Sequence, residues 1–180
     1  MSSLAVVVPL KSFALAKSRL RGELAAVEVL ARELAAGVLR ATSPLPTFIV
    51  TESDDVELFA KDYSLPCLRS ASTGLNAAVH FAYEALSPQF ARVMIVHGDL
   101  RNPEGVATFD PPPGVTIVTD QHGVGTNVLV LPTKHEFLFQ YGPNSRLLHR
   151  RESLRLGLPL TEIDQGPWCF DIDEPGDLLH

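Results

Sequence analysis

Cysteines and long apolar runs are both scarce in this sequence of 180 residues. The two cysteines, Cys67 and Cys169, lie far apart and belong to no C-x-x-C pair, so we expect buried reduced thiols rather than a disulfide or a zinc site. No apolar run approaches the roughly 18 residues that cross a membrane, and no basic segment followed by an apolar one stands at Met1. We therefore expect a soluble, cytoplasmic protein that makes no use of a membrane.

Positive charge is limited as well. The formal net charge is −6, and no stripe of basic residues interleaved with aromatic ones occurs, which argues against nucleic-acid binding. The sequence also lacks internal repeats, low-complexity segments and linker-like stretches. A chain of this length is within the usual size of one folding unit, and we expect residues 1–180 to form a single domain.

Short β-branched runs alternate with helix-like segments along the chain. The expected strands are residues 4–9, 47–51, 65–69, 93–96, 115–119, 126–132, 160–164 and 168–173. The expected helices are residues 23–40, 54–61 with Ser53 as cap, 73–86 and 145–156, with a final helical turn from Glu174. Three strand-to-helix repeats predict right-handed crossovers, and hence an α/β fold with a mostly parallel, doubly wound sheet covered by helices on both faces. Strand 126–132 follows its predecessor too closely for a crossover helix, which favours an antiparallel pairing.

Residues 93–96 (VMIV) are the expected centre of the sheet, because four consecutive apolar residues suit a strand that is buried on both faces. Gly98 and Asp99 follow this strand, and open α/β sheets bind their ligands at the carboxyl ends of the strands. Asp99 is therefore a candidate site residue. Taken alone, an Asp after a strand also fits a turn or a helix cap.

Two further loops carry charge that suits polyphosphate chemistry. Lys11, Lys17 and Arg19 precede a predicted helix, where cations and free helix-end N–H groups suit a triphosphate, although a solvated basic loop is the alternative. Asp171 and Asp173 alternate along an expected extended segment and can both turn toward one cation. An Asp-x-Asp pair before proline also serves as a helix cap.

The order of six short motifs, which together cover nearly the whole chain, resembles that of a known family. The motifs are residues 8–11 (VPLK) with 16–20 (AKSRL), 74–78 (GLNAA), 97–100 (HGDL), 120–127 (DQHGVGTN), 141–145 (YGPNS) with His149, and 171–177 (DIDEPGD). In this order they are similar to the phospholactate guanylyltransferases, which act in the synthesis of the deazaflavin coenzyme F-420. The resemblance implies a Rossmann-like nucleotidyltransferase fold, as in the nucleotide-diphospho-sugar transferases and the molybdenum cofactor guanylyltransferases.

The resemblance also implies a role for each motif. GTP would be bound by Lys11, Lys17, Arg19, Gly74 and Asn76, of which the three cations would also be catalytic. The acceptor acid would be bound by Thr126, Gly142 and Ser145, and Mg²⁺ would be held by Asp99, Asp171 and Asp173. The chemistry fits, because joining a phosphorylated acid to GTP makes one anion attack another and requires cations and positioning rather than a covalent nucleophile.

These inferences predict a Mg²⁺-dependent guanylyltransferase that joins GTP to a three-carbon phosphorylated acid and releases pyrophosphate. Phosphoenolpyruvate is preferred to 2-phospho-L-lactate as the acceptor, and a homodimer and a downstream transferase of the same pathway are the expected protein partners. Two alternatives stay open. The chain would otherwise be another nucleotidyltransferase, of the sugar-phosphate or molybdopterin type, or a non-catalytic nucleotide-binding protein.

Smaller expectations concern residues beside these motifs. His97 is interpreted as a hydrogen-bonded histidine at a strand end rather than as a base. The Ser145 hydroxyl and the first free N–H groups of its helix are expected to meet one anion. One side chain is expected to face a ligand, and the rest to face water, among Arg146, His149, Arg150 and Arg151.

Overall fold

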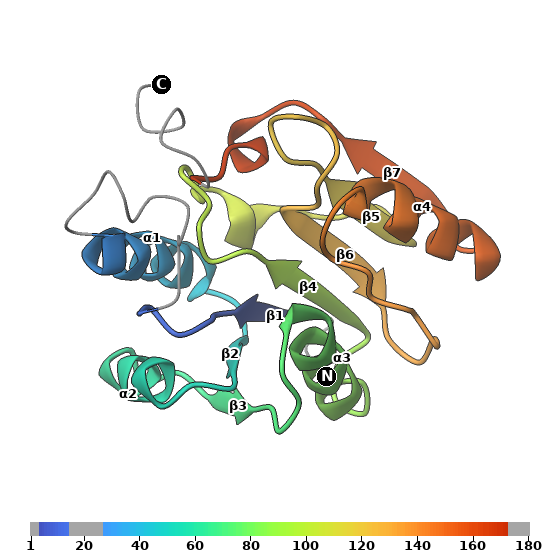
Figure 1. The fold of residues 1–180 in the computed structure, drawn as a ribbon. Helices are drawn as coiled ribbons and strands as arrows, with labels where there is room; N and C mark the ends of the chain where they lie inside the picture. The colour runs from blue at the N-terminus through green and yellow to red at the C-terminus, as the bar shows by residue number, and fades with distance from the viewer. Residues whose placement is uncertain (1–3, 15–26, 173–180) are drawn as a thin grey trace.

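The computed structural model describes residues 4–14 and 27–172, and their strands form one seven-stranded sheet (Figure 1). The strands are β1 Leu4–Pro9, β2 Thr47–Thr51, β3 Cys67–Arg69, β4 Arg92–Val96, β5 Val115–Val118, β6 Val128–Pro132 and β7 Leu160–Ile163. Their order across the sheet is β3-β2-β1-β4-β6-β5-β7, which puts β4 in the middle, as predicted. The helices are α1 Val27–Thr42, α2 Asp54–Asp62, α3 Leu75–Leu86 and α4 Ser145–Arg155, and two short 3₁₀ turns are η2 Val106–Thr108 and η3 Pro167–Cys169.

The sheet is mostly parallel, which confirms the predicted α/β class. β1 pairs in parallel with β2 and β4, β2 pairs in parallel with β3, and β5 pairs in parallel with β7. β6 runs antiparallel to both β4 and β5, as its short connection from β5 requires. The start of β6 therefore lies at the same end of the sheet as the carboxyl ends of the other strands.

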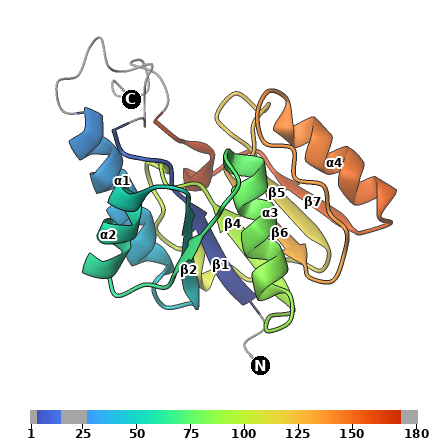
Figure 2. The ribbon, with the colours of Figure 1, turned by 60° about the horizontal axis from the view of Figure 1, so that its bottom comes forward.

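Alternating side chains of the strands fill two cores, one on each face of the sheet. Val6 and Val8 of β1 point into the core under α1 and α2, whereas Ala5 and Val7 point into the core under α3. Figure 2 shows α3 lying across β1 and β4, with α4 farther along the sheet beside β5 and β7. Helices thus cover both faces, as the strand and helix alternation predicted.

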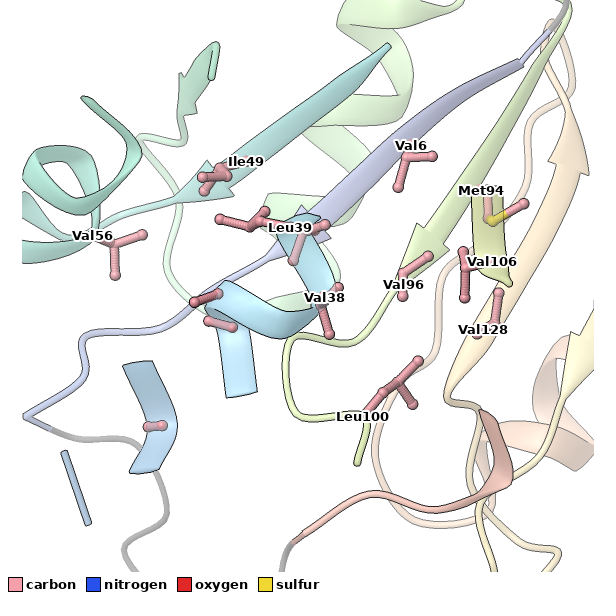
Figure 3. Close-up of a cluster of buried hydrophobic side chains, with 14 of the residues drawn as sticks. Val6, Val38, Leu39, Ile49, Val56, Met94, Val96, Leu100, Val106 and Val128 are labelled. Atoms are coloured by element: carbon pink, nitrogen blue, oxygen red, sulfur yellow. The ribbon is translucent and has the colours of Figure 1, made fainter. Parts of the chain in front are cut away.

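The contacts of the first core fix α1 to the strands that carry the site. Figure 3 shows Val38 and Leu39 of α1 among the side chains of Val6, Ile49 and Val96. All five residues are at most 1% exposed. Replacing a fully buried leucine such as Leu39 by alanine costs about 2–5 kcal/mol. This packing therefore holds α1 firmly against β1, β2 and β4.

The predicted strand over residues 168–173 is wrong in its described part. Pro167–Cys169 forms a 3₁₀ turn instead, and Asp171 makes only an isolated bridge. The cause is local, because the proline has no N–H for a strand ladder and favours the first position of a helical turn. The indole N–H of Trp168 also donates to the Glu104 carbonyl oxygen at 3.0 Å, which holds the turn in place.

Smaller differences concern helix ends. The described part of the first helix begins at Val27 and continues to Thr42, whose hydroxyl bonds back to carbonyl groups of the last turn. Ser53 stands at the N-cap of α2, but its hydroxyl makes no capping hydrogen bond. The final helical turn expected from Glu174 lies outside the described residues. Within the segments that the structure describes, every helix is too short or too polar to cross a bilayer.

Candidate functional site

A cavity of about 640 Å³ opens at the end of the sheet where the parallel strands finish. Its walls come from residues that directly follow β1, β2 and β4, from the turn between β5 and β6, and from the start of α4. A cavity of this size is typical of sites for small ligands and cofactors. Seven residues predicted from the sequence line it, namely Lys11, Gly74, Asp99, Thr126, Gly142, Ser145 and Asp171.

The other four predicted site residues are not among the described lining. Lys17, Arg19 and Asp173 lie outside the described residues. Asn76, in the first turn of α3, bonds to the backbone of Tyr141: its Oδ1 accepts the N–H at 2.6 Å, and its Nδ2 donates to the carbonyl oxygen at 3.1 Å. Asn76 therefore fixes the segment that enters Gly142 and shapes the cavity without lining it.

Lys11 leaves β1 on a loop that is held by Asp55 of α2. The Oδ2 atom of Asp55 accepts the Phe13 N–H at 2.8 Å and the Ser12 hydroxyl at 3.2 Å. Burial alone would raise the pKa of Asp55, but hydrogen bonds from Ser53, Phe13 and Ser12 outweigh this effect and lower the pKa below its ordinary value. Phe13 is itself only 2% exposed, so polar and apolar contacts together fix the loop beside Lys11.

Asp99 and Asp171 are brought together by main-chain hydrogen bonds between two loops. Leu100 and Asp171 form an antiparallel bridge, and the Ile172 N–H donates to the Asp99 carbonyl oxygen at 3.3 Å. Both aspartates line the cavity, and carboxylate oxygens are the hard ligands that Mg²⁺ prefers, so the pair fits the predicted cation. In the part of the chain that the structure describes, no three His, Cys, Asp or Glu side chains converge as a metal site, and Asp173, the third predicted ligand, lies outside that part.

The turn between β5 and β6 sets Thr126 at the cavity wall. The Oδ1 atom of Asp120 accepts the Val124 N–H at 2.8 Å, and the Asp120 carbonyl oxygen accepts the Gly123 N–H at 3.0 Å. A Cβ atom at Gly125 would lie 2.6 Å from Asp120 Oδ2, so a side chain there would displace the carboxylate that closes the turn. Thr126 follows directly and is 2% exposed.

Gly142 and Ser145 form another wall at the start of α4. Gly142 has a φ of +125°, which residues with a Cβ adopt only with strain. The buried Ser145 hydroxyl donates to Thr126 Oγ1 at 3.3 Å, so the two predicted acceptor-binding hydroxyls meet. The expectation that the first helix N–H groups are free is wrong for two of them, since the Ser145 N–H donates to the Gly142 carbonyl oxygen and the Arg146 N–H to that of Val124, both at 3.1 Å.

The helix residues that follow do not reach the cavity. Its described lining includes none of Arg146, His149, Arg150 and Arg151, so the expectation that one of them faces a ligand stays a prediction that this cavity does not support. Arg146 and Arg150 pair with Glu162 of β7 at 2.8 Å and 3.3 Å. His149 faces neither ligand nor water: it is wholly buried, with Nδ1 3.1 Å from Thr126 Oγ1.

Two acidic residues near the cavity were missed from the sequence. Glu52 directly follows β2, lines the cavity and accepts the Gly74 N–H at 3.1 Å through Oε2. The strand-end rule that selected the aspartate after β4 would also have selected Glu52. Asp55 lies in the first turn of α2, and no local signal in the sequence indicates its hydrogen bond to the distant loop. The main-chain N–H of His97 donates to the Asn127 carbonyl oxygen at 3.0 Å, and His97 also lines the cavity.

A doubly wound sheet whose strand ends present a lysine loop, two carboxylates and paired hydroxyls fits the nucleotidyltransferase fold that the resemblance of the motifs implies. A solved structure with a similar fold comes from Desulfovibrio desulfuricans G20 and is provisionally named a nucleotide-diphospho-sugar transferase. Its TM-score is 0.71 at 15% identity, and the match covers 99% of this chain and 85% of that chain. The fold class predicted from the motifs is therefore confirmed.

The chain belongs to the family described as "Guanylyl transferase CofC like", whose model matches residues 4–180. It is 30% identical to the phosphoenolpyruvate guanylyltransferase of Chloroflexus aurantiacus, over 94% of this chain and 89% of that relative. It is 33% identical to the 2-phospho-L-lactate guanylyltransferase of Natrialba magadii, over 84% of this chain and 71% of that relative. These matches confirm the resemblance and make the protein an enzyme of the nucleotidyltransferase class.

Proposed function

We propose that this enzyme transfers a guanylyl group from GTP to a three-carbon phosphorylated acid, in the biosynthesis of coenzyme F-420. Phosphoenolpyruvate is the acid that we favour, because the Chloroflexus relative is named for it and matches nearly the whole chain. The 2-phospho-L-lactate for which the Natrialba relative is named is the second choice. The observation that carries the proposal is the cavity, which gathers Lys11, Asp99, Asp171, Thr126 and Ser145.

The proposed reaction joins two anions. An oxygen of the acceptor's phosphate attacks the α-phosphorus of GTP, the new P–O bond forms as the bond to the oxygen that bridges the α- and β-phosphates breaks, and pyrophosphate leaves with that electron pair. At an effective dielectric constant of about 20, two unit charges about 4 Å apart repel by about 4 kcal/mol. The enzyme therefore has to supply positive charge and fixed hydrogen-bond donors more than a nucleophile.

The lining residues can divide this work between them. Lys11 suits the phosphate groups of GTP, and Asp55 holds the loop on which it stands. Asp99 and Asp171 would hold Mg²⁺, which supplies Lewis-acid stabilisation of the phosphate charge when bound. Thr126 and Ser145 suit the carboxylate or phosphate of the acceptor, because hydrogen bonds from hydroxyls to a charged oxygen are among the stronger ones.

A screen of pyrophosphate release tests the proposal. Each of the four nucleoside triphosphates is combined with phosphoenolpyruvate, 2-phospho-L-lactate or 3-phosphoglycerate in the presence of Mg²⁺. We expect release with GTP and phosphoenolpyruvate. Preference for CTP or ATP would contradict the guanylyl assignment and indicate a nucleotidyltransferase of another type. Nucleotide binding without release from any pair would contradict turnover and indicate a binding protein.

A further inference from the structure

Helix α4 is attached to the fold through polar side chains. Its buried residues are Ser145, His149, Glu152 and Ser153. Buried polar groups need hydrogen-bond partners, and two of these residues find them in neighbouring loops. Glu152 accepts the Leu138 N–H at 2.8 Å, and the Ser153 hydroxyl donates to the Leu158 carbonyl oxygen at 3.1 Å. The other two, Ser145 and His149, both contact Thr126, which lines the cavity.

The backbone determines which nitrogen of His149 carries the proton. Nε2 lies 3.0 Å from the main-chain nitrogen of Gln140, whose N–H can only donate. Nε2 is therefore the acceptor, and the neutral ring carries its proton on Nδ1. Nδ1 lies 3.1 Å from Thr126 Oγ1, so the Nδ1–H group donates to the threonine oxygen. This tautomer is the only neutral form that satisfies both contacts.

The surroundings keep the ring neutral and out of reach of ligands. His149 is 0% exposed, and its ring lies 4.7 Å from the Tyr141 ring and 5.9 Å from the Phe137 ring, measured between centroids. Burial first, and the nearby His97 second, lower the pKa of His149 to about 4, although Glu152 on the same helix opposes this shift. The titratable groups facing the ring are thus His97, Tyr141 and Glu152. His149 is therefore shielded from the cavity, and its hydrogen bond toward the lining goes to Thr126.

The contacts of Thr126 leave its hydroxyl hydrogen for the cavity. Thr126 Oγ1 receives the Nδ1–H of His149 and the hydroxyl hydrogen of Ser145, and a hydroxyl has two acceptor lone pairs and one hydrogen. Among the residues that the structure describes, no acceptor takes that hydrogen. The Thr126 hydroxyl is thus a donor toward the cavity. When an anion enters, the Ser145 hydroxyl can rotate to donate to it, because His149 still holds Thr126 in place.

We propose that His149 is a positioning residue that sets Thr126 as a hydrogen-bond donor to the anionic acceptor. This inference rests on the proposed function, in which the anion is the carboxylate or phosphate of the phosphorylated acid. The spacing on α4 supports it. Ser145 and His149 are four residues apart, so they lie on one face of the helix and reach the same threonine oxygen.

Two substitutions separate the two hydrogen bonds of the ring. In His149→Asn, the side-chain amide nitrogen takes the place of Nδ1 and keeps a donor for Thr126. In His149→Gln, the longer side chain places its oxygen near the site of Nε2, which keeps an acceptor for the Gln140 N–H and removes the donor to Thr126. We expect His149→Gln to raise the KM for phosphoenolpyruvate about tenfold with little change in the KM for GTP, and His149→Asn to stay within about threefold of wild type.

Other results would overturn the role of His149. If His149 had only a structural role, both variants would lose stability and shift both KM values alike, or His149→Asn would be the more damaging change. Selective ¹⁵N labelling of histidine in the wild-type protein gives a measurement that needs no variant to fold. We expect the NMR spectrum to show His149 protonated on Nδ1 and bare on Nε2 from about pH 5.5 to about pH 8.5. The opposite tautomer would refute the inference.

The outcomes also distinguish this inference from the proposed function. Wild-type turnover together with an unchanged phosphoenolpyruvate KM in His149→Gln would overturn only the role of His149. Absence of pyrophosphate release from every pair of nucleotide and acid would overturn the proposed function, and the acceptor role of His149 with it.

Discussion

Replacing Asp55 by asparagine should weaken GTP binding although Asp55 is absent from the described cavity lining. The carboxylate accepts two hydrogen bonds from the loop that carries Lys11, at 2.8 Å from the Phe13 N–H and 3.2 Å from the Ser12 hydroxyl. Hydrogen bonds to a charged group contribute about 1.5–3 kcal/mol each, and those to a neutral group about 1 kcal/mol. Replacing the charged acceptor of both bonds by a neutral one therefore costs roughly 2 kcal/mol in total. Since 1.4 kcal/mol is a factor of ten, and part of the loss falls on folding, we expect the GTP KM to rise about tenfold.

The neighbouring residue provides a matched control. Asp54 stands on the same first helical turn, its side chain is 90% exposed, and it pairs with Arg69 at 2.8 Å on the surface. Such pairs contribute about 0–1 kcal/mol, so Asp54→Asn should leave both KM values unchanged. Steady-state kinetics with GTP and phosphoenolpyruvate varied in turn, together with melting curves, give all the required values. Equal effects of the two substitutions, or an equal rise in the acceptor KM for Asp55→Asn, would refute the reasoning.

Four further outcomes are expected. Asp99→Asn or Asp171→Asn should lower kcat by about two orders of magnitude with little loss of melting temperature. Full activity of either variant at low Mg²⁺ would instead show that the two aspartates have only a structural role. Ser145→Ala should raise the KM for phosphoenolpyruvate about tenfold and leave the KM for GTP unchanged. A stability loss of about 1 kcal/mol with both KM values unchanged would show that Ser145 is purely structural. Asn76→Ala removes two hydrogen bonds to the backbone and should destabilise the fold by about 1–3 kcal/mol in urea unfolding, with kcat/KM reduced for both substrates. The folded-state pKa of Asp55 lies below its ordinary value of 3.8, so its contribution to stability is complete well above pH 3.8 and is lost as the pH falls through the folded pKa. The difference in melting temperature between wild type and Asp55→Asn should therefore be constant near pH 7 and shrink only below about pH 4.5, and a difference that shrank near pH 6 would contradict this.

Apolar patterning predicted the sheet because a strand buried on both faces tolerates few polar side chains. Residues 93–96 are all buried in β4, at the centre of the strand order. The same pattern located the carboxyl end of β4, and with it Asp99 in the cavity. Lys11 follows the end of β1 and lines the same cavity. The sequence therefore located those cavity residues that directly follow a buried strand.

The face of α4 illustrates what apolar patterning cannot detect. Its buried positions 145, 149, 152 and 153 have the spacing of one helix face, yet all four are polar. A search for apolar residues finds no stripe there, and the identity of the buried face depends on partners far along the chain. For His149 one of these partners is the main-chain N–H of Gln140, in a segment without regular structure. Any residue other than proline would supply that N–H, so the sequence carries no sign of it.

The antiparallel direction of β6 explains why both halves of the candidate site share one cavity. Val96, the last residue of β4, pairs with Val128, the first residue of β6, so Thr126 enters the sheet beside the segment that carries Asp99. If β6 ran parallel to β4, residues before it would lie at the opposite end of the sheet, about 17 Å away for a five-residue strand. Thr126 could then not reach Ser145, which it contacts at 3.3 Å. One reversed strand therefore places the proposed acceptor hydroxyls and the proposed metal carboxylates around one cavity, where the two anions of the proposed reaction have to meet.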